Sequence, residues 1–123
     1  MKRIQIACCG VAEKLLSPLE NSGNCQLTHF GDSGPESSGD VKLAYFLQSG
    51  PAPDLILVGY PGARGLAACD HLYSRPNAPP ILWLCDREEF GPEAELMGVG
   101  FFHTGSPDKR TPAAILEALQ RML

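Results

Sequence analysis

The 123 residues predict an α/β fold in which a parallel β-sheet is covered by helices on both faces. Strand-like apolar runs alternate along the chain with stretches whose apolar residues recur at helical spacing. Two of the strand-like runs, residues 54–59 and 81–85, are apolar almost throughout, which is typical of strands buried on both faces of a parallel sheet. Five strands and five helices then favour a doubly wound, flavodoxin-like sheet with strand order 2-1-3-4-5.

The individual elements follow from these patterns. Strands are expected from the β-rich and apolar runs at residues 2–7, 25–30, 54–59, 81–85 and 99–103. Helices are expected from apolar residues at helical spacing in residues 11–21, 40–47, 66–73, 93–97 and 112–123. Segments rich in Gly, Pro or Ser separate them at residues 31–39, 50–53 and 60–65. The pattern shows no linker and no internal repeat, so residues 1–123 are expected to form one domain.

Three of the expected helical segments begin with capping signals. Asp40 is a suitable N-cap for the second helix. Asp86, with Glu89 three residues later, has the spacing of a capping box. Thr111 followed by a proline suits the N-cap and first position of the last helix.

Composition and charge exclude several classes of function. The net charge of −4 gives no electrostatic reason to expect a nucleic-acid partner. No apolar run approaches the roughly 20 residues that span a bilayer, and the N-terminus lacks the apolar core of a signal peptide. The five cysteines are scattered and odd in number, which suits reduced thiols better than a disulfide framework. We therefore expect a cytoplasmic protein that has no membrane partner.

Cysteines and a glycine follow the central strands of the predicted sheet. Sites in doubly wound sheets lie outside the carboxyl ends of the strands. The first, third and fourth strands are neighbours in the predicted order, so we expect Cys8, Cys9, Gly59 and Cys85 to share this rim.

Four segments of the sequence resemble the receiver (CheY-like) domain of two-component response regulators. They are "KRIQIACCG", "PDLILVGYPGARGL", "PPILWLCD" and "AAILEALQRML", and the match covers nearly the whole chain. The resemblance implies the flavodoxin-like fold and a role in signal transduction. In that family an acidic pair after the first strand holds Mg²⁺ and an aspartate after the third strand accepts the phosphoryl group. A Thr or Ser ends the fourth strand and a lysine ends the fifth.

The sequence departs from the family at each of these positions. The acidic pair aligns with Cys8 and Cys9, the phosphoacceptor with Gly59, the hydroxyl residue with Cys85, and the lysine with Thr104 or the glycine after it. Thiols are poor ligands for Mg²⁺, and glycine carries no nucleophile. The resemblance therefore implies a pseudo-receiver that is not an enzyme, needs no cofactor or metal, and is not phosphorylated on aspartate.

The resemblance also implies a docking face. Receiver domains usually bind partners through the fourth helix, fifth strand and fifth helix. Here that face includes Phe101, Phe102, His103 and the last helix. The expected partner is a protein: a kinase, a regulator or a second copy of the chain.

Cysteine chemistry is the alternative interpretation. Three thiols on one rim, together with His103, offer soft ligands to zinc, and Cys8 with Cys9 offers a vicinal redox pair. The segment "IACCGVAEKLL" also resembles the phosphocysteine loop of phosphotransferase-system IIB domains, although Glu13 stands where an anion would bind. An enzyme of this kind requires an exposed thiol of low pKa at Cys8 or Cys9.

The remaining polar candidates receive structural interpretations. His29 and His71 are expected on the surface, and Trp83 in the core. The Gly-Asp-Ser-Gly segment at residues 31–34 resembles a phosphate loop only in composition, and Arg64 is expected to be a solvated loop residue.

Overall fold

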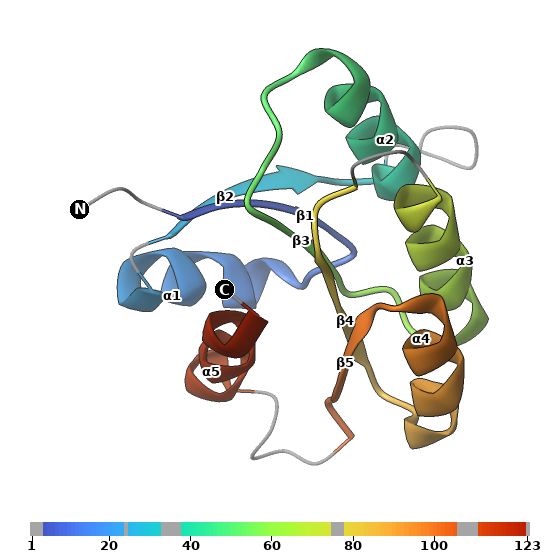
Figure 1. Cartoon of the computed structure of the whole chain (residues 1–123). Helices are drawn as coiled ribbons and strands as arrows, with labels where there is room; N and C mark the ends of the chain where they lie inside the picture. The colour runs from blue at the N-terminus through green and yellow to red at the C-terminus, as the bar shows by residue number, and fades with distance from the viewer. Residues whose placement is uncertain (1–3, 24, 33–37, 75–77, 106–110, 123) are drawn as a thin grey trace.

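The computed structural model contains a five-stranded sheet whose neighbouring strands all run parallel, in the order β2-β1-β3-β4-β5 (Figure 1). It describes the chain except for residues 1–3, 24, 33–37, 75–77, 106–110 and 123. The strands are β1 (Ile4–Cys9), β2 (Cys25–Phe30), β3 (Leu55–Val58), β4 (Ile81–Cys85) and β5 (Gly100–His103). The predicted fold class and strand order are confirmed.

Helices cover both faces of the sheet. They are α1 (Glu13–Gly23), α2 (Gly39–Ser49), α3 (Gly62–Tyr73), α4 (Gly91–Met97) and α5 (Pro112–Met122), and a short 3₁₀ helix, η1 (Glu88–Phe90), precedes α4. Helices α1 and α5 lie against one face, and α2, α3 and α4 against the other (Figure 1). No helix in the described part of the chain is long and apolar enough to cross a membrane.

Each face of the sheet carries its own apolar core. Every residue of β3 and β4 is buried, as the near-continuous apolar runs predict. Side chains that alternate along the strands enter the two cores in turn. Trp83 enters the core under α3 and α4, where its ring lies edge-on to Phe90 and Phe101. The prediction that Trp83 is a core residue is confirmed.

Of the three predicted helix caps, the one at Thr111 is confirmed and those at Asp40 and Asp86 are wrong. Thr111 caps α5, because its Oγ1 accepts the Ala114 N–H at 3.2 Å. Asp40 is not an N-cap: α2 begins one residue earlier, and the N–H of Gly39 donates to the Asp32 carboxylate at 2.7 Å. That bond satisfies a donor at the helix start, so Asp40 is left in the first turn.

The capping box expected from Asp86 is also absent in the described residues. Arg87 occupies the N-cap position of η1, and its side chain makes no capping hydrogen bond. The η1 segment is a single 3₁₀ turn that continues into α4, so it lacks the regular first turn that a capping box needs.

Candidate functional site

The two adjacent cysteines lie inside β1 and not beyond its end. β1 runs to Cys9, two residues further than the sequence predicts. Because side chains alternate across a strand, Cys8 enters the core under α1 and α5, whereas Cys9 enters the core under α2, α3 and α4. Both side chains are fully buried. They therefore point to opposite faces of the sheet and do not form a vicinal pair.

The backbone of the predicted rim does come together. The Gly59 N–H donates to the Cys9 carbonyl at 2.9 Å, and the Thr104 N–H donates to the Cys85 carbonyl at 2.8 Å. The Cys85 thiol is buried and contacts the Arg87 carbonyl oxygen at 3.5 Å. The structure thus places Gly59 beside Cys9 and Thr104 beside Cys85 at the carboxyl edge, but it turns the three thiols into the cores.

Burial makes the thiols of Cys8, Cys9 and Cys69 poor nucleophiles. It raises the pKa of Cys8 to about 12, with a further contribution from Glu20, and it raises the pKa of Cys69 to about 12. The pKa of Cys9 also rises, mainly through burial and then through the charge of Asp40. A reactive cysteine needs an exposed thiolate, so neither Cys8 nor Cys9 meets the requirement of the redox and phosphocysteine interpretations. Within the described residues, no group of three His, Cys, Asp or Glu side chains is arranged to hold a metal ion.

The loops after β1 and β3 contact each other through bare backbone. A Cβ added at Gly59 would come within 2.7 Å of the Gly10 carbonyl oxygen and 3.1 Å of the Val11 Cα. Gly10 has a φ of +72°, and a Cβ there would come within 2.7 Å of the Tyr60 ring. The space into which a side chain at position 59 would extend is therefore occupied by the β1–α1 loop.

Three side chains, Asp32, Tyr60 and Arg64, connect two loops at the rim. The sequence pattern alone gives them no joint role. The Asp32 carboxylate accepts hydrogen bonds from the Tyr60 hydroxyl at 2.7 Å and from the Arg64 guanidinium at 2.8 Å, in addition to the Gly39 N–H. The guanidinium carbon of Arg64 lies 3.9 Å from the centre of the Tyr60 ring. We call this group the Asp32–Tyr60–Arg64 cluster. It joins the loops after β2 and β3 across the end of β1.

Electrostatics and packing hold this cluster in place. The hydrogen bonds from Gly39, Tyr60 and Arg64 lower the pKa of Asp32 to about 2. Burial and the bond to Asp32 raise the pKa of the Tyr60 hydroxyl. The Tyr60 carbonyl accepts the indole N–H of Trp83 at 2.8 Å, which fixes the loop to β4. The prediction that Arg64 is only a solvated loop residue is therefore wrong, although half of its side chain is exposed.

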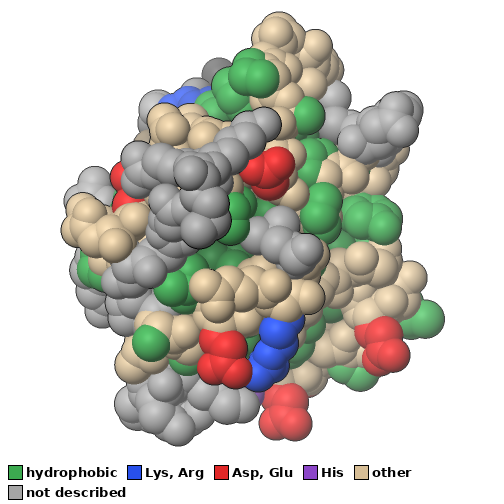
Figure 2. Space-filling model, turned by 60° about the vertical axis from the view of Figure 1, so that its left-hand side comes forward, with side chains coloured by type: hydrophobic (Ala, Val, Ile, Leu, Met, Phe, Trp, Pro, Cys, Tyr) green, Lys and Arg blue, Asp and Glu red, His purple; other side chains and the backbone are tan. Residues whose placement is uncertain are grey.

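Charged side chains elsewhere on the surface are dispersed. Among the described side chains on the face shown in Figure 2, the Lys and Arg side chains do not gather into a patch. Acidic and basic side chains lie there among uncharged ones, with hydrophobic side chains between them. The described side chains of this face therefore form no continuous basic surface.

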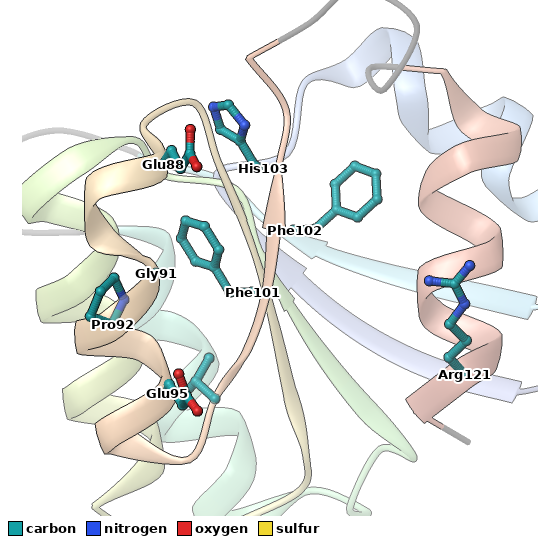
Figure 3. A pocket seen from close by; sticks show the side chains of 9 residues that line it. Glu88, Gly91, Pro92, Glu95, Phe101, Phe102, His103 and Arg121 are labelled. Atoms are coloured by element: carbon teal, nitrogen blue, oxygen red, sulfur yellow. The ribbon is translucent and has the colours of Figure 1, made fainter.

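A groove of about 880 Å³ follows β5 between α4 and α5 (Figure 3). Phe101, Phe102 and His103, the three predicted docking residues, all line it. Figure 3 shows Phe101 directed toward α4 and Phe102 directed toward α5, with β5 between them. The other lining residues come from η1, α4, the α4–β5 turn and α5: Glu88, Gly91, Pro92, Glu95, Val99 and Arg121.

Solved structures of response-regulator domains are similar to this chain. The response regulatory domain of protein mrkE from Klebsiella pneumoniae superposes with a TM-score of 0.67 at 18% identity, over 96% of this chain and 93% of that one. A response regulator protein from Burkholderia multivorans gives 0.58 at 22% identity, over 99% and 95%. The chain has the fold of a response-regulator receiver domain.

A third similar structure has a different description. A protein described as pilus assembly-related, from Burkholderia pseudomallei, superposes on this receiver fold with a TM-score of 0.62 at 16% identity, over 98% of this chain and 88% of that one. No protein-family model matches the sequence, and no curated protein matches it as a relative.

The receiver fold implies a Mg²⁺ ion at the rim, and the residues present do not fit one. The thiols of Cys8 and Cys9 are turned into opposite cores, and Gly59 offers no side-chain oxygen ligand. The carboxylate of Asp32 is already engaged by three donors.

Proposed function

We propose that this protein is a receiver-fold signalling module that acts by protein–protein contact and not by aspartyl phosphorylation. The observation that carries the proposal is Gly59, which follows β3 where the resemblance assigns the phosphoacceptor. It has no carboxylate to accept a phosphoryl group, and its surroundings leave no room for one. The side chains of the pair that the resemblance assigns to the metal are thiols and supply no oxygen ligand.

The Asp32–Tyr60–Arg64 cluster supports this proposal from the structural side. It joins the loops after β2 and β3 with hydrogen bonds of 2.7 to 2.8 Å that involve a charged carboxylate. Bonds of this kind hold the loops without a metal or a phosphoryl group.

The proposed docking surface is the groove along β5. Phe101 and Phe102 are only half-buried there, on either side of a strand at the edge of the sheet. Leu96 of α4, with 87% of its surface exposed, does not line the groove itself, but it lies one helical turn after Pro92, which does. The proposed occupant of the groove is a protein: a kinase, a regulator or a second copy of the chain.

Site-specific photo-crosslinking in native cells tests the docking surface. A photoreactive phenylalanine analogue is placed at Leu96, and the matched control carries it at Tyr45 of α2, whose side chain is 67% exposed. The proposal predicts a discrete protein adduct from position 96 and none of comparable yield from position 45. Equal labelling from both positions, or adducts only from position 45, would refute the proposed docking face.

A further inference from the structure

One long side of β5 faces away from the sheet. β5 is the last strand in the order β2-β1-β3-β4-β5, so no described strand pairs with its outer side. The Thr104 N–H donates to the Cys85 carbonyl in β4. Backbone groups alternate in direction along a strand, so Phe102 also directs its N–H and C=O to β4. The N–H and C=O groups of Phe101 and His103 therefore point outward, into the groove between α4 and α5.

The opposite edge of the sheet, formed by β2, exposes more polar side chains than β5 does. At the edge strand β2, Gln26, Thr28 and His29 are exposed, which is the polar surface that keeps an edge strand from pairing. At β5 the edge is flanked by Phe101 on one face and Phe102 on the other. An incoming strand would gain backbone hydrogen bonds at either edge. At β5 it would lie between two adjacent half-buried phenylalanines, whereas at β2 the half-buried Leu27 and Phe30 are interrupted by exposed polar side chains.

The charged residues of the groove indicate which side chains an incoming strand would carry. Glu88 and Glu95 line the α4 side of the groove, both exposed. On the α5 side the lining cation, Arg121, is already paired with Glu117. A side chain that reaches over Phe101 toward α4 therefore meets two carboxylates that form no ion pair with another described residue. Lysine suits this position because its aliphatic stem covers an apolar ring while its ammonium reaches an acid.

We propose that β5 binds an extended, basic segment of a partner protein by β-strand addition. Lysine or arginine residues of that segment face Glu88 and Glu95, and apolar residues alternate with them and face Phe102. This inference rests on the proposed function, because it names the chemistry of the partner at the same docking face.

A second copy of the chain is the less favoured occupant. Antiparallel pairing of two β5 strands about a twofold axis normal to the sheet places α4 beside α4 of the other copy. Glu88 and Glu95 of one copy would then face those of the other, and like charges on paired elements oppose association.

The test uses a terminally blocked peptide of alternating lysine and valine, six residues long, titrated into the isotopically labelled full chain. The inference predicts saturable shifts at the backbone amides of Phe101 and His103. A peptide in which glutamate replaces lysine should not bind. N-methylation of the backbone N–H groups on the edge facing β5 should weaken binding at least about tenfold, because it removes donors to the strand. Binding that survives N-methylation, or shifts confined to other elements, would overturn strand addition.

Two pairs of variants sharpen the result. His103→Pro removes an outward N–H and should abolish binding, whereas His103→Ala removes the same side chain but keeps that N–H, and should lose less binding than His103→Pro. The double variant Glu88→Lys, Glu95→Lys should bind the glutamate peptide more tightly than the lysine peptide, which reverses the preference of the parent. If the charge reversal leaves the preference unchanged, the proposed chemistry is wrong. Concentration-dependent dimerisation through β5 would also overturn it, while the crosslinking from Leu96 would still decide the docking face itself.

Discussion

The Cα of Gly59 lies so close to the Gly10 carbonyl that an added Cβ would come within 2.7 Å of its oxygen. These two glycines follow β3 and β1, the adjacent inner strands on whose ends receiver chemistry depends in the resemblance. Their contact leaves no volume at the place where a phosphoacceptor side chain would extend. The rim of this protein is therefore a packed backbone surface, and the Asp32–Tyr60–Arg64 cluster lies beside it.

Substitution at Gly59 should destabilise the fold. Gly59→Ala forces the β1–α1 loop to move, and overpacking of this kind costs about 1–3 kcal/mol in the free energy of unfolding. Gly31→Ala is the matched control, because the nearest atom to its Cβ is the His29 Cε1 at 3.7 Å, an ordinary contact. Urea denaturation of both variants measures the difference. Equal stability of the two variants would contradict the packed rim.

The Asp32 carboxylate should contribute to stability at neutral pH and lose that contribution in acid. Its folded pKa, about 2, lies below the ordinary value of 3.8, so the contribution is fully present above pH 4 and declines as the pH falls toward 2. Asp32→Asn should cost about 1 kcal/mol at pH 7, a modest value because the side chain is 40% exposed to water.

Unfolding measured at pH 7 and pH 2.5 checks this prediction. The acid-induced loss of stability should be smaller in Asp32→Asn than in the parent. Asp70→Asn, at an exposed position on α3, is the matched control for the substitution itself. An unaltered acid response in Asp32→Asn would show that the cluster contributes nothing to stability.

The cysteines should be unreactive while the protein is folded. All five thiols are buried. An aromatic disulfide reagent at pH 8 should label them only at the rate at which the protein opens, and all five should react promptly in denaturant. A thiol at Cys8 or Cys9 that reacts in the native protein as fast as free cysteine would restore the enzyme interpretation.

Alkaline pH should destabilise the protein through the same thiols. Cys8 and Cys69 each have a folded pKa of about 12 against an ordinary value of 9.0, so the stability they contribute is intact below pH 9 and is lost between pH 9 and 12. Each thiol contributes at most about 1.4 kcal/mol per pH unit to that loss. Denaturation at pH 8 and pH 10 should show a smaller decline for Cys8→Ala than for the parent, and an identical decline would contradict the prediction.

Sequence periodicity was sufficient for the fold because each element carries its own pattern. The apolar runs of β3 and β4 predict strands buried on both faces, and both are buried. The same reasoning placed Gly59 beside Cys9 at the carboxyl edge and gathered Phe101, Phe102 and His103 on one strand. These inferences need only the order of elements and the direction of strands.

Side-chain arrangements at the rim were beyond sequence reasoning for two physical reasons. Strand ends are uncertain by one or two residues, and a strand that continues to Cys9 turns Cys8 and Cys9 into opposite cores instead of presenting them at a tip. The cluster of Asp32, Tyr60 and Arg64 depends on contacts across the end of β1 between loops that are distant in the chain. The signal that could have found it is an acid after the second strand together with Tyr and Arg after the third.

Mass spectrometry of the intact protein after incubation with a small acyl-phosphate donor and Mg²⁺ tests the central claim most directly, with the Gly59→Asp variant treated in parallel. The account predicts no phosphoryl adduct on the parent chain, and none on the variant, because position 59 has no room for an aspartate and the described residues offer no metal site beside it. A stable aspartyl-phosphate on the parent, above all at Asp86 after β4, would contradict it.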